Sequence, residues 1–97
     1  MNSIALPRVE VSAHAIDRLS ERCLHIWQEQ GRERGVGLMS FFITKSREAY
    51  ATLLNAVAGN SISICSCKVS HDGVTYVFTT ENGVTRLVTG YLSNTSN

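Results

Sequence analysis

The chain has 97 residues, of which 43% are hydrophobic, enough for one domain with a single core and not for a second. The formal net charge is +1 and the pI is about 7.8, which excludes the strong basic excess of a non-specific nucleic-acid coat protein but leaves room for a local basic patch. No apolar run approaches membrane-spanning length, and residues 1–7 lack a charged region followed by an apolar core. We therefore expect no membrane association and no signal peptide.

The first predicted elements are an extended lead-in over residues 1–11 and a helix over residues 12–30. The lead-in holds the only proline, Pro7, and can add an edge strand to a sheet. Ser12 is a favourable N-cap, because its hydroxyl can accept a hydrogen bond from the first helical turn. At about 100° per residue the apolar side chains gather on one side of this helix; they are Ala15, Ile16, Leu19, Cys23, Ile26 and Trp27.

The middle of the chain predicts a loop and then a helical region over residues 38–58. Three glycines and three charges over residues 31–37 indicate the loop. The apolar run over residues 38–43 fits either a helix or a strand, so the start of the helix lies near 38 or near 45. The apolar stripe that should face the core consists of Tyr50, Leu53, Leu54 and Val57. The pair Gly59-Asn60 should end the helix, because both residues tolerate the left-handed conformation.

Residues 61–92 change to a twofold period, which predicts a β-meander. The dipeptides Asp72-Gly73 and Asn82-Gly83 favour tight hairpin turns. Turns at these positions set the register as His71–Val74, Cys67–Phe78, Phe78–Leu87, Tyr76–Thr89 and Val74–Tyr91. With residues 93–97 as a frayed polar tail, the expected fold is α+β, with two helices on one face of a three-stranded antiparallel meander.

The exposed side of the first helix carries a row of nitrogen donors: His14, Arg18, Arg22 and His25. They project within about 80° of one another at helical spacing. Two guanidinium groups can clamp a phosphate, and a histidine can move a proton, which together suit cleavage of an RNA backbone. The alternative is an ordinary solvated helix surface, since Asp17, Glu21 and Glu29 lie on or beside the same face and can pair with the arginines.

Residues 12–22 read Ser-Ala-His-Ala-Ile-Asp-Arg-Leu-Ser-Glu-Arg. With the short extended segment before them, they resemble the opening of small phage and plasmid proteins with the pattern S-x-H-A-x-x-R-(L/M)-x-x-R. These are similar to BrnT-like and related groups with the RelE-like, barnase-type toxin fold. The last predicted strand, residues 83–91, resembles theirs too, whereas residues 31–60 do not. The resemblance covers the two ends of the chain.

This resemblance implies a RelE/barnase-like fold and a metal-independent ribonuclease, without a cofactor, in a bacterial host cytoplasm. Its substrate would be RNA, and an antitoxin would be a further partner. The positions that carry over as catalytic residues are His14, Arg18, Arg22 and Tyr91; Thr89, and His25 from the row, would bind substrate.

A second hypothesis is a non-enzymatic, phage-type protein that binds and modulates a host enzyme or nucleic-acid-processing complex. It follows from the nearly neutral charge and from adjacent Phe41 and Phe42, which cannot both point the same way on a helix. At least one could then be partly exposed and anchor a partner; the equal alternative is that one ring fills the core and the other lies over the sheet edge. The residues expected to bind such a partner are Arg32, Arg34, Phe41 and Phe42.

The three cysteines lack the spacing of a disulfide framework and favour reduced thiols, as in a cytoplasmic protein. Cys65, Cys67 and His71 fall on one predicted face, and Cys23 lies on the helix that covers it. These four residues could therefore form a zinc site. However, a C-x-C pair on one strand lacks the knuckle geometry of structural zinc sites. Core packing is therefore the favoured interpretation, and we expect no metal ligands here.

Overall fold

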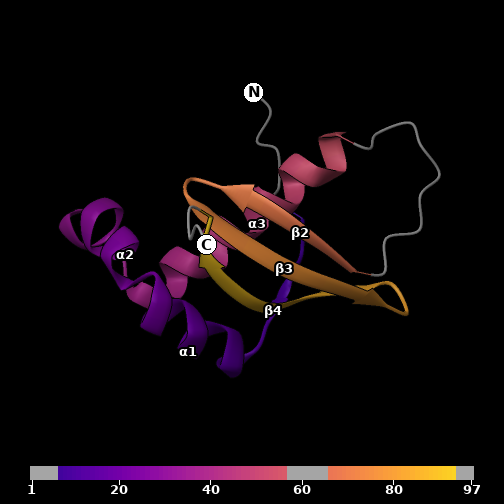
Figure 1. The fold of residues 1–97 in the computed structure, drawn as a ribbon, viewed down its shortest axis with the longest axis horizontal. Coiled ribbons are helices and arrows are strands. Elements are labelled where there is room, and N and C mark those ends of the chain that lie inside the picture. The colour runs from indigo at the N-terminus through magenta and orange to yellow at the C-terminus, as the bar shows by residue number, and fades with distance from the viewer. Residues whose placement is uncertain (1–6, 57–65, 94–97) are drawn as a thin grey trace.

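The computed structural model describes residues 7–56 and 66–93. The elements follow in the order β1 (Glu10–Val11), α1 (Ala13–Arg22), α2 (Leu24–Gln30), the 3-10 turn η1 (Arg32–Arg34), α3 (Leu38–Ala56), β2 (Ser66–His71), β3 (Val74–Glu81) and β4 (Val84–Leu92). The strands form one sheet in the order β1-β4-β3-β2, with β1 parallel to β4 and the other pairs antiparallel. The predicted α+β class is confirmed (Figure 1).

The prediction of one helix over residues 12–30 is wrong in one respect: this segment forms two helices, α1 and α2. Ser12 caps α1 as expected, with its Oγ accepting a hydrogen bond from the Ala15 amide at 3.0 Å. The chain leaves helical geometry at Cys23 (φ −127°, ψ 21°) and begins again as α2 at Leu24. The predicted loop after it contains η1, and the helical region starts at Leu38, the earlier of the two starts considered.

Both predicted hairpin turns are present. Asp72 and Gly73, and Asn82 and Gly83, all have positive φ, as the tight turn between two twisted strands requires. The pairs His71–Val74, Cys67–Phe78 and Phe78–Leu87 are confirmed. The extended lead-in supplies β1, which pairs with β4 at Arg86 and Leu87.

The predicted register is wrong beyond Leu87. Phe78 pairs with Leu87, but Val77 pairs with Thr89, so Val88 is an extra residue in β4. Tyr76 then lies opposite Gly90, and Val74 lies opposite Leu92, in place of the expected Thr89 and Tyr91. A bulge of one residue reverses which side chains of the following strand face the core.

The core lies between the sheet and the helices. Its largest fully buried side chains include Tyr76, Phe42, Phe78, Leu19 and Leu87. The buried positions of α3 are Phe41, Phe42, Ser46, Ala49 and Tyr50. The predicted apolar stripe is therefore only partly right, because Leu53 is half-buried and Leu54 is exposed. Val57, Gly59 and Asn60 lie outside the described residues. Within the described ranges, no helix is long and apolar enough to cross a membrane.

Candidate functional site

The basic row begins on the exposed face of α1. Ala15, Ile16 and Leu19 bury one side of this helix, which turns His14 and Arg22 toward solvent. Arg18 Nε lies 3.5 Å from His14 Nε2, so the guanidinium donates toward the imidazole at the outer limit of a hydrogen bond. Arginine carries no acceptor, so Nε2 of His14 is the acceptor in this contact.

Arg18 also has an acidic neighbour, as the alternative interpretation of an ordinary solvated helix surface predicts. Its Nη1 donates to Glu21 Oε1 at 3.1 Å, and both side chains are well exposed. Ion pairs of this kind contribute little free energy, because water and salt screen them. A phosphate that approaches Arg18 therefore competes with a weak pair.

Arg22 connects the row to the sheet. Its Nη1 donates to the main-chain oxygen of Gly90 at 3.4 Å, across a sequence separation of 68 residues. Gly90 lies between Thr89 and Tyr91 on β4, so the two strand residues of the candidate site flank the group that Arg22 contacts. Thr89 and Tyr91 are both half-buried.

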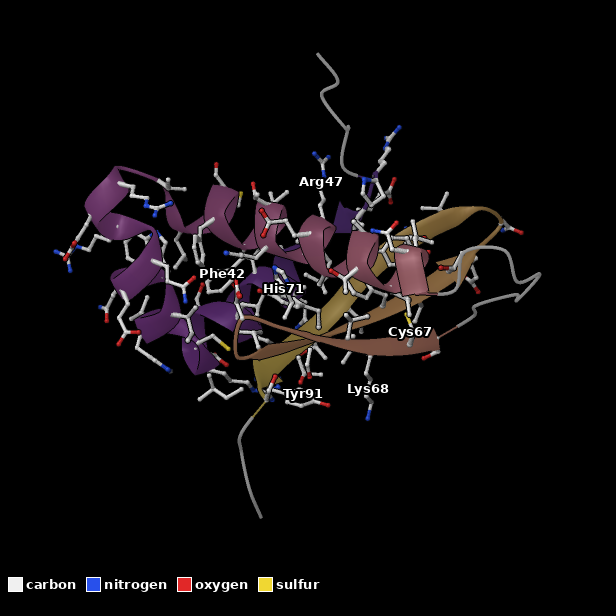
Figure 2. The ribbon with its side chains drawn as sticks, turned by 90° about the horizontal axis from the view of Figure 1, so that it is seen from above. Phe42, Arg47, Cys67, Lys68, His71 and Tyr91 are labelled. Carbon is white, nitrogen blue, oxygen red and sulfur yellow. The ribbon has the colours of Figure 1, made fainter. Side chains whose placement is uncertain are left out.

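Tyr91 lies on the outer side of the sheet because of the bulge at Val88. It pairs with Thr75, and Figure 2 shows Tyr91 and Lys68 on the side of the sheet away from α3. The predicted pairing of Tyr91 with Val74 puts Tyr91 on the core face with Tyr76 and Phe78, and this placement is therefore wrong. The bulge also aligns Thr89 with Lys68 across the sheet, since Lys68 pairs with Val77 and Val77 pairs with Thr89.

The row is too long for all of its members to act on one phosphate. His14 and Arg22 are eight residues apart on α1, a rise of about 12 Å at 1.5 Å per residue. His25 belongs to α2, beyond the break at Cys23, so the helical period that aligned it with Arg22 does not apply. The structure thus brings together two pairs: His14 with Arg18, and Arg22 with the β4 segment around Gly90.

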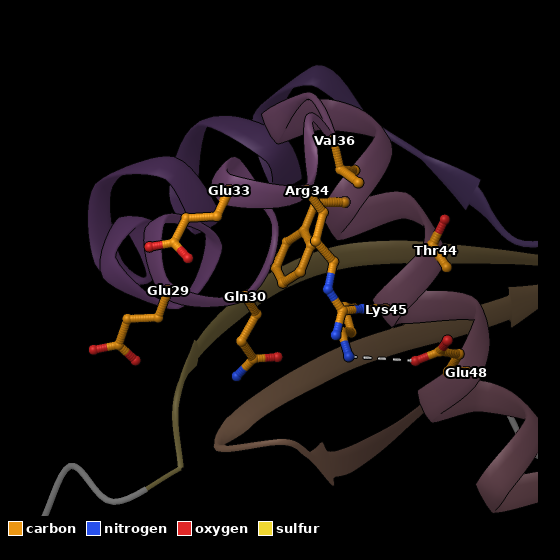
Figure 3. A pocket seen from close by; sticks show the side chains of 9 residues that line it. Glu29, Gln30, Glu33, Arg34, Val36, Thr44, Lys45 and Glu48 are labelled. Carbon is orange, nitrogen blue, oxygen red and sulfur yellow. Dashed lines mark ion pairs between the residues drawn. The ribbon is translucent and has the colours of Figure 1, made fainter.

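A pocket of about 590 Å³ lies between η1, the end of α2 and α3 (Figure 3). Two of the four residues expected to bind a partner, Arg34 and Phe41, contribute to its wall, and Arg32 is exposed on η1. Of the two alternatives for the adjacent phenylalanines, burial is the one observed, because Phe41 is 6% exposed and Phe42 is 0% exposed. Their rings meet edge to face at 5.1 Å.

Of the described cysteines, Cys23 is a buried thiol and Cys67 is a half-buried one. Burial raises the pKa of Cys23 to about 11, although the positive charge of Arg22 acts in the opposite direction, and burial also raises the pKa of Cys67. Both groups therefore stay protonated at neutral pH, which agrees with core packing. Cys65 lies outside the described residues.

Sequence reasoning missed a cluster of four charged or titratable side chains where α3 meets the β2–β3 turn. Lys45 Nζ lies 2.7 Å from Asp72 Oδ2 and 3.7 Å from Glu48 Oε1. His71 Nε2 donates to Glu48 Oε1 at 3.1 Å and lies 3.6 Å from Asp72 Oδ2. The hydrogen bond from Lys45, aided by its charge and that of His71, holds the pKa of Asp72 below its ordinary value of 3.8. Helical spacing of Lys45 and Glu48 was visible in the sequence, but their meeting with the turn was not.

Comparison with known proteins adds no relative. No family model matches the chain, and neither the curated proteins nor the solved structures gave a match.

Proposed function

We propose that this chain is a small ribonuclease of the toxin type that cleaves RNA without a metal ion. The observation that carries the proposal is the hydrogen bond from Arg22 to Gly90, because it holds the basic row of α1 against the β4 backbone between Thr89 and Tyr91. The S-x-H-A-x-x-R-L-x-x-R motif of residues 12–22 supports the same proposal through its resemblance to toxin-fold proteins.

In this proposal the reacting phosphate binds at the first pair of the row. His14 takes the proton of the ribose 2′-hydroxyl through Nε2, the nitrogen that accepts from Arg18 in the free protein. The 2′-oxygen attacks phosphorus, and the bond to the 5′-oxygen breaks. That oxygen takes a proton from water, and the hydroxide left behind removes the proton from His14. The products are a 2′,3′-cyclic phosphate and a 5′-hydroxyl.

Arg18 has the electrostatic role in this step. Negative charge grows on the phosphoryl oxygens as the 2′-oxygen attacks, and a guanidinium beside them stabilises that charge more than the charge of the ground state. Its exposed partner Glu21 is easily displaced.

The second pair of the row would bind the adjoining part of the strand. At about 12 Å from His14 along the helix, Arg22 would contact a neighbouring phosphate, and Tyr91 and Thr89 would contact the nucleotide beside it. Tyr91 is therefore a binding residue in this proposal, not the acid for the leaving group.

Expression in bacterial cells tests the proposed activity. Wild type should arrest growth or translation, and His14→Ala or Arg18→Ala should relieve the arrest while the protein still accumulates. Arg8→Ala removes an exposed cation outside the row and should remain toxic. A wild-type protein that neither arrests growth nor cleaves RNA would refute the proposal.

A second candidate function is binding to a host protein complex, and one observation favours it. Arg34 and Phe41 both line the pocket beside η1, whose volume lies within the range of about 300–1,000 Å³ typical of binding sites. Pull-down from host lysate should then enrich one protein, and Arg34→Ala should lose it while Arg8→Ala retains it. A chain that remains monomeric with no enriched partner contradicts this candidate.

A further inference from the structure

The cluster between α3 and the β2–β3 turn contains three groups that can each give one ligand atom to a metal ion. The ligand atoms of Glu48, His71 and Asp72 all lie within 4.8 Å of one another. Glu48 comes from the middle of α3, His71 is the last residue of β2, and Asp72 lies in the turn that follows, which the left-handed backbone of Asp72 (φ 51°) and Gly73 closes tightly. The cluster therefore forms because α3 packs on the sheet, and not because its residues are close in the sequence.

Two of the three distances within the cluster, both from His71, are close to those of a tetrahedral zinc site. Two ligand atoms bound to one Zn²⁺ at about 2.0–2.1 Å lie about 3.4 Å apart at the tetrahedral angle. His71 Nε2 lies 3.1 Å from Glu48 Oε1 and 3.6 Å from Asp72 Oδ2. One imidazole and two carboxylates leave a fourth position for water. The side chains are 23% exposed for His71, 38% for Glu48 and 48% for Asp72, so an ion can reach them from solvent.

Lys45 already supplies a positive charge at this place. Its ammonium lies 2.7 Å from Asp72 and 3.7 Å from Glu48, so a metal ion must displace it. The displaced side chain has somewhere to go, because Lys45 also lines the pocket beside η1, where Glu29 and Glu33 contribute carboxylates (Figure 3). A flexible four-carbon stem permits this movement.

We propose that Glu48, His71 and Asp72 form a Zn²⁺ site in which the metal exchanges with the ammonium of Lys45. The ion would tie the β2–β3 turn to α3 and move a cation into the adjacent pocket. The site lies on elements other than α1 and β4, so it is independent of the proposed RNA cleavage.

Titration of the metal-free, full-length chain with zinc chloride, followed by calorimetry, tests the site. We expect one ion per chain, affinity reduced at least about tenfold by His71→Ala or Glu48→Gln, and no change with His25→Ala, an exposed histidine elsewhere. Lys45→Met should bind zinc more tightly than wild type, because the competing ammonium is absent. Circular dichroism confirms that each variant is folded.

Cobalt substitution identifies the ligands. Bound Co²⁺ should show the visible d–d absorption of a four-coordinate ion and no thiolate-to-metal charge-transfer band, since the proposed ligands are nitrogen and oxygen. A thiolate band, equal zinc affinity in wild type and His71→Ala, or no zinc binding at about 100 μM would each overturn the proposal.

Discussion

Leu19 packs directly against the backbone of Gly90. A Cβ atom at position 90 would lie 2.5 Å from Leu19 Cδ2 and 3.2 Å from its Cγ. The absence of a side chain on Gly90 thus lets α1 approach β4 closely, and Arg22, three residues after Leu19, reaches the Gly90 oxygen from the same helix. The position of the candidate site depends on this contact.

Gly90→Ala should destabilise the protein by about 1–3 kcal/mol, the usual cost of an extra methyl group in a filled core. Leu19 is completely buried and cannot move aside freely. Chemical denaturation measures the loss. In a Leu19→Ala background the same substitution should cost clearly less, because the side chain that it meets is gone. An equal cost in both backgrounds would show that the two residues do not interact.

Arg18→Ala should weaken binding of single-stranded RNA and reduce its dependence on salt. Each phosphate neutralised on a single strand contributes about 0.7 to the slope of log affinity against log salt concentration, so the slope should fall by about that amount. Fluorescence anisotropy at several salt concentrations measures it. Arg8→Ala is the matched control and should keep the wild-type slope; an unchanged slope in Arg18→Ala would remove Arg18 from the RNA-binding surface.

Phe42→Ala should destabilise the fold by about 3–5 kcal/mol, the range for loss of a buried phenylalanine. Its ring is fully buried, whereas Met39 on the same helix is 58% exposed, so Met39→Ala should change the free energy of unfolding by less than about 0.5 kcal/mol. Urea denaturation compares the two. Similar values for both variants would mean that α3 has a different rotation about its axis.

Asp72→Asn should lower stability at neutral pH and leave it nearly unchanged in acid. The pKa of Asp72 is lowered in the folded protein, so its contribution is present above the ordinary value of 3.8 and disappears as the pH falls through the lowered folded value. The Asp72 side chain is exposed, so water screens its pair with Lys45 and limits the effect to at most about 1 kcal/mol. Asparagine tolerates the left-handed turn, so the backbone is retained. Thermal melts from pH 2 to 7 measure it, and a difference that grows in acid would contradict this assignment.

Much of the fold follows from local rules. Apolar spacing predicted the buried face of α1, and Ser12 predicted its start, because both depend only on helical geometry and capping. Asp72-Gly73 and Asn82-Gly83 predicted the hairpins, since few other dipeptides accept two consecutive positive φ values.

The errors occur where tertiary packing overrides these rules. Cys23 interrupts the helix without glycine or proline, and Val88 forms a bulge without a glycine, so neither residue type gave a signal. The bulge moved Tyr91 to the outer face of the sheet. Phe41 and Phe42 are both buried because several elements surround the start of α3, which one helix pattern cannot reveal. His14 and Arg18 were correctly expected to be adjacent, because a separation of four residues is local on a helix.

The most direct test of the proposed ribonuclease is the cleavage of a short RNA by purified protein in the presence of EDTA. Wild type should produce 2′,3′-cyclic phosphate ends, should leave the matching DNA intact, and should lose at least about 100-fold in rate on His14→Ala, the lower end of the contribution of a general base. Arg8→Ala should cleave at the wild-type rate. A folded wild-type protein that does not cleave RNA, or a His14→Ala variant that cleaves as fast as wild type, would contradict the account.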